Sequence, residues 1–330
     1  MRKLSDEIGP RCGASNESYV KLEAAASYIQ SHFELTLRGR VEDRALVVQA
    51  YDEGGRRYGN AIVEIEGSES DEVVVVGAHY DSYCPPGEPP TPGADDNASG
   101  VAVLLELVRI FDERQRAVPG RLRRALRFVA FANEEAPYFQ TAGMGSLVHA
   151  QQSQRKGETI AAMLSLEMLG YFSDEPGSQH YPWGVERVVG PLPDQGNFVA
   201  VVGSFGARTL VDEVVLAFRR GTTLPVEGLA APLIPQLQWS DNWAFSQSGY
   251  PAVMVTDTAF ERNPNYHRAS DTWNTLDYAR MSMAVDGLVE VIAVLGGDGN
   301  MRSTMSTNSA ALPALLMASR NAATPGIAGR

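Results

Sequence analysis

The stretch Val-Val-Val-Val-Gly-Ala at residues 73–78 constrains the fold of this chain more than any other feature. Four consecutive β-branched residues have no polar face, so they predict a strand that is buried on both sides. Strands of this kind lie at the centre of a sheet that helices cover on both faces. His79 and Asp81, which follow the run, are therefore expected at the carboxyl end of that strand.

Strands and helices alternate along the rest of the chain. Apolar runs and helical periodicity predict further buried strands at 124–132, 161–169, 198–202 and 251–256, and helices at 19–33, 101–111, 207–219 and 276–295. This alternation predicts an α/β fold, a three-layer α/β/α sandwich around a central mixed, mostly parallel sheet.

The same pattern suggests one domain over residues 1–300, because neither an internal repeat nor a linker divides it. Residues 171–206 carry several Pro and Gly residues, and we expect them to form an insertion near the active site. Residues 301–330 are rich in Ser, Thr and Ala, which is typical of a mobile C-terminal tail.

The charge balance excludes one class of partner. The chain has 40 acidic and 28 basic residues and a formal net charge of -12, so it would repel a phosphate backbone and is not expected to bind nucleic acid. No run approaches the roughly 18 apolar residues of a membrane span, and no apolar segment follows the charged N-terminus. We therefore expect a soluble, cytoplasmic protein, or a secreted one if a signal has been removed. The sequence makes no prediction of oligomeric state.

The two cysteines, Cys12 and Cys84, do not form a Cys-x-x-Cys pair, so a thiolate zinc site is not expected. They could form one disulfide. Two cysteines alone do not show this, and two free thiols are the simpler expectation.

Acidic and histidine side chains gather where the predicted strands end, which is where ligands bind in open α/β sheets. These residues are His79, Asp81, Asp95, Asp96, Glu134, Glu135, Glu167 and His267. Glu167 stands within the apolar run Met-Leu-Ser-Leu-Glu-Met-Leu, and a carboxylate in such a strand needs a partner. A metal ion would supply one.

Five motifs in this order resemble those of the M28 zinc peptidases. They are His-x-Asp at 79–81, Gly-Ala-Asp-Asp-Asn-Ala-Ser-Gly at 93–100, Asn-Glu-Glu at 133–135, Leu-Glu-Met-Leu-Gly at 166–170 and Tyr-His at 266–267. The resemblance extends from about residue 8 to residue 277. It implies a zinc-dependent exopeptidase, most directly an aminopeptidase that hydrolyses the N-terminal bond of a peptide with a free N-terminus.

The resemblance also implies a ligand set. Asp95 would bridge two zinc ions, His79 and Glu167 would complete one site, and Glu135 and His267 would complete the other. Imidazole and carboxylate are ligand types that zinc accepts without cysteine. Two ions per chain are expected, and one is possible because Glu167 stands where many family members carry aspartate.

Further roles follow from the same resemblance. Glu134 would act as general base toward a metal-bridged water, and Tyr266 could donate a hydrogen bond to the developing oxyanion. Asp81 would hold the second ring nitrogen of His79. A cis peptide that the family carries after its bridging aspartate would fall at residues 95–96.

Two residues are candidates for substrate contact. Asp241 belongs to a Ser-Asp pair that resembles one beside the family's site. Arg262 is close to His267 in sequence and could meet a carbonyl or carboxylate group of the substrate.

Three alternatives stay open. Glutaminyl-peptide cyclotransferases share this scaffold and use one zinc, but they carry tryptophan where this chain has Tyr266. A non-catalytic scaffold would be free to lose its ligands, whereas all five expected positions hold ligating residue types here. A carboxypeptidase would need a basic cluster for the substrate's C-terminal carboxylate.

Overall fold

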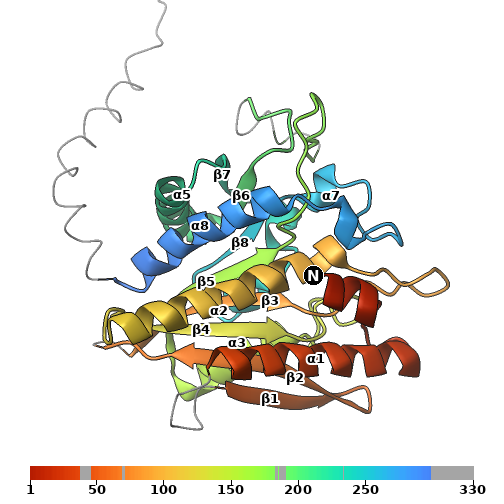
Figure 1. Ribbon diagram of the computed structural model, residues 1–330, viewed down its shortest axis with the longest axis horizontal. Helices are drawn as coiled ribbons and strands as arrows, with labels where there is room; N and C mark the ends of the chain where they lie inside the picture. Colours follow the sequence, from red (N-terminus) through yellow and green to blue (C-terminus); the bar gives the residue numbers. More distant parts are fainter. Residues whose placement is uncertain (38–45, 69–70, 183–184, 186–190, 233, 299–330) are drawn as a thin grey trace, which may run out of the picture.

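The computed structural model describes residues 1–37, 46–68, 71–182, 185, 191–232 and 234–298 (Figure 1). The predicted tail at 301–330 lies outside the described residues. Eight strands form one sheet in the order β1-β2-β4-β3-β5-β8-β6-β7. Their bounds are β1 (Leu46–Glu53), β2 (Arg56–Ile65), β3 (Glu72–His79), β4 (Ala125–Phe131), β5 (Thr159–Glu167), β6 (Val199–Gly203), β7 (Val226–Ala230) and β8 (Ala252–Thr256).

The sheet is mixed, as predicted. Its centre is parallel, because β3 pairs in parallel with both β4 and β5, and β5 pairs in parallel with β8. Antiparallel pairs join β1 to β2, β2 to β4 and β6 to β8, while β7 adds to β6 in parallel. The carboxyl ends of β3, β4, β5 and β8 therefore meet at one edge.

Helices cover both faces of the sheet and complete the three layers. Neighbouring helices α1, α2, α8 and α5 lie across one face, and α3 and α6 pack on the other (Figure 1). The helices are α1 (Asn16–Thr36), α2 (Gly100–Ala117), α3 (Gly145–Lys156), α5 (Arg208–Gly221), α6 (Asn242–Gln247), α7 (Ala259–Arg262) and α8 (Tyr278–Leu295). Short helical turns are η1 (Lys3–Ile8), η2 (Ala94–Ser99), η3 (Phe205–Ala207), η4 (Pro235–Gln238) and η5 (Trp273–Thr275).

The valine run of β3 explains how both layers attach to the sheet. Side chains alternate across a strand, so neighbouring residues enter opposite cores. Val74 and Val76 pack in the core that includes α1, α2 and α8, while Val73 and Val75 pack in the core that includes α3 and α6. Burial on both faces, predicted from the run, is confirmed.

Among the elements that the sequence patterns did not predict are one strand and one helix. The first is β7, whose sequence Val-Glu-Gly-Leu-Ala carries a charge and a glycine; as an edge strand it is only partly buried. The second is α6, which spans only 6 residues and is too short to show helical periodicity.

The expectation of free thiols is wrong, because Cys12 and Cys84 form a disulfide with a Cα–Cα distance of 6.4 Å. The two cysteines are separated by 72 residues, so their proximity depends on the tertiary fold. The segment before α1 lies along the loop after β3, where the Ser82 backbone N–H donates to the Arg11 carbonyl at 2.9 Å.

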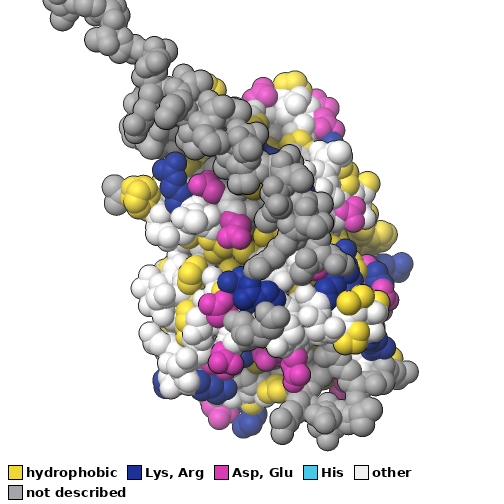
Figure 2. Space-filling model, turned by 90° about the vertical axis from the view of Figure 1, so that its left-hand side faces the viewer, with side chains coloured by type: hydrophobic (Ala, Val, Ile, Leu, Met, Phe, Trp, Pro, Cys, Tyr) yellow, Lys and Arg dark blue, Asp and Glu magenta, His cyan; other side chains and the backbone are white. Residues whose placement is uncertain are grey.

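The surface carries charged side chains of both signs. On the face drawn in Figure 2, acidic and basic side chains of the described residues are interspersed. Among the helices that the structure describes, none is long and apolar enough to cross a membrane.

Candidate metal centre

Two histidines and four carboxylates converge at the carboxyl edge of the parallel strands. His79 and Glu167 are the last residues of β3 and β5. Glu134 and Glu135 follow β4, Asp96 lies in η2, and His267 follows α7. All but His267 are buried. The edge predicted from the strand ends is thus the place where these side chains meet.

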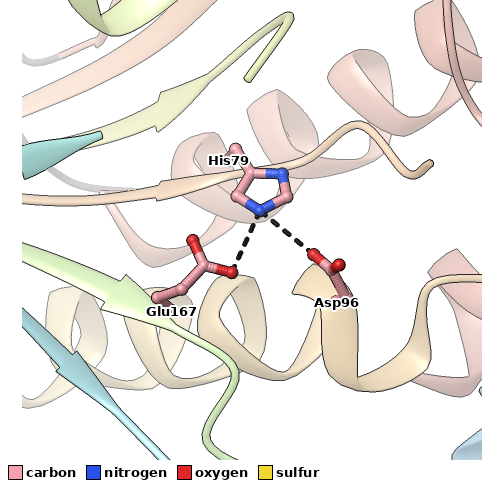
Figure 3. A group of neighbouring side chains, drawn as sticks. All are labelled: His79, Asp96 and Glu167. Carbon is pink, nitrogen blue, oxygen red and sulfur yellow. Dashed lines mark hydrogen bonds and ion pairs between the residues drawn. The ribbon is translucent and has the colours of Figure 1, made fainter. Parts of the chain in front are cut away.

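The carboxylate of Asp96 lies at the centre of this cluster. Its Oδ1 is 3.3 Å from His79 Nε2, and its Oδ2 is 3.1 Å from His267 Nε2. Glu167 Oε1 is 3.4 Å from His79 Nε2 (Figure 3), and Glu135 Oε2 is 3.6 Å from His267 Nε2. Two ligand groups therefore share Asp96, with Glu167 completing the His79 group and Glu135 completing the His267 group.

Asp95, predicted as the bridging ligand, does not enter the cluster. Its Oδ1 accepts a hydrogen bond from the Gly170 backbone N–H at 2.9 Å, and its Oδ2 accepts one from Asn263 Nδ2 at 2.8 Å. Both oxygens are therefore bound within the protein. The prediction was wrong by one residue, because adjacent aspartates offer the same chemistry and only the backbone course separates them.

The backbone around Asp95 and Asp96 also differs from the prediction by one residue. The cis peptide joins Asp96 to Asn97, not Asp95 to Asp96. The backbone N–H groups of Asp95 and Asp96 donate to the two carboxylate oxygens of Asp271, at 2.9 and 3.2 Å. Asp271 thus fixes the turn that directs Asp96 toward the histidines.

Glu167 reaches the cluster despite its extra methylene. Its Oε1 faces His79, and its Oε2 accepts a hydrogen bond from Ser240 Oγ at 2.5 Å. Ser240 in turn lies 2.7 Å from Ser165 Oγ. The hydroxyl pair holds the longer carboxylate in place, so glutamate is accommodated at this position.

Asp81 connects the ends of two strands. Its two oxygens accept hydrogen bonds from the backbone N–H groups of Glu134 and Glu135, each at 3.0 Å. Its Oδ1 is also 3.4 Å from His79 Nδ1. Asp81 therefore lies behind the histidine, and it also shapes the turn that presents both glutamates.

The cluster has more carboxylates than imidazoles, and the pKa values of its glutamates are raised. Burial raises the pKa of Glu134 well above its usual range, and the nearby Glu167 and Glu135 carboxylates add to the shift. Burial also raises the pKa of Glu135 to about 7 and raises that of Glu167. Although burial opposes its charge, hydrogen bonds to Asp96 and Glu135 raise the pKa of His267 to about 10.

This donor set fits divalent metal ions. Buried carboxylates need a cation or hydrogen-bond donors to offset the cost of burial. Oε1 of Glu135 is buried and has no hydrogen-bond partner among the described residues. Imidazole nitrogens and carboxylate oxygens are ligands that zinc accepts.

His267 is oriented by two aromatic rings. Tyr266 stacks on one face with ring centroids 3.9 Å apart and an interplanar angle of 21°, and Tyr83 stacks with centroids 3.9 Å apart at 12°. Burial, with the nearby Asp96 and Glu135 carboxylates, raises the pKa of Tyr266, so its hydroxyl keeps its proton. Tyr83 belongs to no sequence motif, so the sequence patterns did not point to it.

The structure places Asp241, a predicted substrate contact, in the interior, and its contact with substrate stays a prediction. Its side chain is fully buried at the start of α6, so it does not lie on the protein surface. Burial raises its pKa to about 7.

Arg262, the other predicted substrate contact, is also buried. Its Nε donates to Gln179 Oε1 at 2.7 Å, and its Nη1 donates to the carbonyls of Gly196 and Phe198 at 3.0 and 2.9 Å. The guanidinium therefore ties α7 to the segment before β6 through Nε and Nη1, and its contact with substrate stays a prediction.

Comparison with known proteins finds a matching family model and similar relatives. The model of peptidase family M28 matches residues 60–201. Uncharacterized protein YfbL of Escherichia coli is 36% identical over 296 residues, which cover 88% of this chain and 85% of that protein. Probable aminopeptidase YDR415C of Saccharomyces cerevisiae is 25% identical over 76% of this chain, which spans only 61% of the yeast protein.

Solved structures share the fold. LapB from Legionella pneumophila matches with a TM-score of 0.66 and 21% identity over 89% of this chain and 70% of that one. A Bacteroides thetaiotaomicron glutaminyl cyclase matches with a TM-score of 0.61 and 17% identity over 88% and 94%. A zinc aminopeptidase from Bacillus subtilis matches with a TM-score of 0.52 and 20% identity over 73% and 50%.

Proposed function

Because the chain belongs to peptidase family M28, we propose that it is a zinc-dependent aminopeptidase acting on peptides with a free N-terminus. The observation that carries the proposal is the position of Asp96, whose two carboxylate oxygens face two different histidines. A bridging carboxylate of this kind suits a pair of metal ions. The names of relatives such as the yeast probable aminopeptidase support the same activity.

The structure suggests which residues would hold the ions. His79, Asp96 and Glu167 would bind one zinc, and Asp96, Glu135 and His267 the other. Zinc bound there would polarise the scissile carbonyl and lower the pKa of water to ~7. The match to a zinc aminopeptidase structure supports this choice of metal.

Glu134 is the proposed general base. It belongs to neither ligand group, yet its Oε2 lies 3.8 Å from His79 Nε2. From this position its carboxylate would take a proton from the attacking water and pass it to the leaving amine. The protonated hydroxyl of Tyr266, beside His267, would donate a hydrogen bond to the carbonyl oxygen as negative charge develops there.

The basic side chains bear on the choice between an amine terminus and a carboxylate terminus, because two bound zinc ions would offset the charge of the four carboxylates. Arg262, a candidate partner for a C-terminal carboxylate, is instead engaged with carbonyl groups of the chain. This engagement favours an aminopeptidase over a carboxypeptidase.

Hydrolysis of Leu-p-nitroanilide tests the proposal. Chelation should abolish turnover, and added Zn²⁺ should restore it. Turnover that persists after the zinc has been removed would contradict the proposal.

A second candidate is a glutaminyl-peptide cyclotransferase. It is favoured by the likeness to the Bacteroides cyclase, of which this chain covers 94%. The fold alone does not choose between the two reactions. Release of a pyroglutamyl product from a peptide with N-terminal Gln, without hydrolysis of leucyl substrates, would support the cyclase.

The disulfide bears on where the chain works. Disulfides persist in oxidising compartments and are rare in the cytosol. The Cys12–Cys84 bond therefore favours an oxidising compartment over the cytoplasmic location expected from the sequence. Both cysteines are buried, so the protein in extracts of its own cells is alkylated in denaturant without reduction. Both cysteines should stay unlabelled; labelling would contradict this.

A further inference from the structure

His267 is the least enclosed side chain of the candidate metal centre. Its side chain is 28% exposed, whereas that of His79 is 1% exposed. His267 also has a positive φ of 55°, in the left-handed region that few non-glycine residues adopt. Its ring therefore depends on neighbouring groups to keep Nε2 directed at Asp96 and Glu135.

Tyr83 supplies one of those neighbours from a distant part of the chain. Its ring lies nearly parallel to the imidazole, with an interplanar angle of 12° and a centroid separation of 3.9 Å. Stacked aromatic rings attract each other at this separation, and a cationic or metal-bound imidazole strengthens the attraction. Together with Tyr266, it encloses the imidazole on both faces.

The loop that carries Tyr83 is held at several points. The Tyr83 carbonyl accepts hydrogen bonds from the backbone N–H and the hydroxyl of Thr91, at 2.9 and 3.0 Å. Cys84, the next residue, is joined to Cys12. On the other side, Ser82 Oγ accepts a hydrogen bond from the Arg11 backbone N–H at 3.1 Å. The Tyr83 ring is therefore presented to His267 by a restrained backbone.

Arg11 restrains the same loop from within. Its fully buried guanidinium donates to the carbonyls of Tyr80 and Pro92, both at 2.6 Å, and of Gly93 at 2.8 Å. Both ends of the loop are thereby joined to one side chain. The second end leads directly into the turn that carries Asp96. The Arg11 guanidinium therefore restrains both the turn of the proposed bridging ligand and the loop that presents the Tyr83 ring to His267.

From this geometry we propose that Tyr83 is a positioning residue, which holds the His267 imidazole in the orientation that binds metal with Asp96 and Glu135. The inference rests on the proposed function, because it concerns the same metal centre. Residues that orient a metal ligand affect metal affinity by about 10–100-fold when they are replaced. Tyr83 should affect the His267 site and leave the His79 site unchanged.

The test compares zinc binding to wild type, Tyr83→Leu and Tyr83→Phe by competition with a chromogenic chelator. Tyr83→Leu keeps an apolar side chain in the loop but removes the ring, so one zinc should bind about 10–100-fold more weakly while the other keeps its affinity. Tyr83→Phe keeps the ring and should bind both ions as wild type does. Equal affinities in Tyr83→Leu and wild type would overturn the inference.

A second experiment keeps the Tyr83 ring. The double variant Cys12→Ser/Cys84→Ser releases the loop beside Tyr83, and it should weaken the same single ion. Unchanged affinities in this variant would count against the inference. If Tyr83→Leu has a thermal unfolding midpoint too low for the titration, Tyr83→Met, which also lacks the ring, takes its place. Wild type that binds no zinc at all would instead contradict the proposed function.

Discussion

The carboxylate of Asp271 binds the backbone of Asp96, accepting its N–H at 3.2 Å through Oδ2. Its other oxygen accepts the N–H of Asp95 at 2.9 Å. Of the two adjacent aspartates, this turn directs Asp96 to the histidines and leaves Asp95 bound to Gly170 and Asn263. The centre therefore depends on a carboxylate that does not itself belong to either ligand group.

Replacement of Asp96 should remove both metal sites. Asp96→Ala deletes the one carboxylate that the two groups share, so we expect zinc content to fall close to zero with the fold retained. Asp95→Ala is the matched control, because it makes the same change at the neighbouring aspartate, which belongs to neither ligand group, and it should keep its zinc. Elemental analysis of both variants checks this, and full zinc content in Asp96→Ala would refute the bridge.

Glu134→Gln should separate metal binding from turnover. The substitution keeps the shape of the side chain but removes the base, and general base catalysis typically contributes about 10²–10⁴-fold. We expect kcat for Leu-p-nitroanilide to fall by that factor while zinc content and the thermal unfolding midpoint stay near wild type. A variant with near-normal kcat would remove Glu134 from the mechanism.

The disulfide should contribute strongly to stability. It joins residues that are 72 apart, and closing a loop of that length restricts the unfolded chain by about 4 kcal/mol in the chain-entropy model. Cys12→Ser/Cys84→Ser should therefore unfold at markedly lower urea concentration than wild type in non-reducing buffer. In reducing buffer the two proteins should unfold at similar concentrations, and a difference that persists there would assign the effect to the serines.

His149 should make the fold sensitive to acid. Burial lowers its pKa from 6.5 to about 3, and its Nδ1 lies 3.1 Å from Gln49 Oε1. As the pH falls below about 6.5, the unfolded chain binds a proton that the folded chain refuses, so stability decreases until the pH reaches about 3. At pH 5 this amounts to roughly 2 kcal/mol.

The matched variant for this prediction is His149→Gln, which cannot titrate. Its loss of unfolding free energy between pH 7 and pH 5, from urea titrations, should be smaller than that of wild type by roughly 2 kcal/mol. Equal losses in the two proteins would show that His149 does not set the acid sensitivity.

The sequence predicted the fold well because its central strand has one strong signature. A run of valines has no polar face, so both sides of the strand must be buried. The structure has a hydrophobic core on each side of it. Strand ends then located the acids and histidines, since parallel strands share an edge. Signals of this kind are local in the chain, so they can be identified from the sequence alone.

Other features depended on contacts that no local pattern encodes. The choice between Asp95 and Asp96 is made by Asp271, which is about 175 residues away in sequence. The pairing of Cys12 with Cys84 and the stacking of Tyr83 on His267 likewise arise only when distant segments pack together.

The most direct test of the central claim is the zinc content of one preparation that is also assayed with Leu-p-nitroanilide and with a peptide that begins with Gln. The account predicts two zinc ions per chain and hydrolysis of the leucyl substrate. One zinc ion per chain, with cyclisation of the glutaminyl peptide and no leucyl hydrolysis, would contradict it.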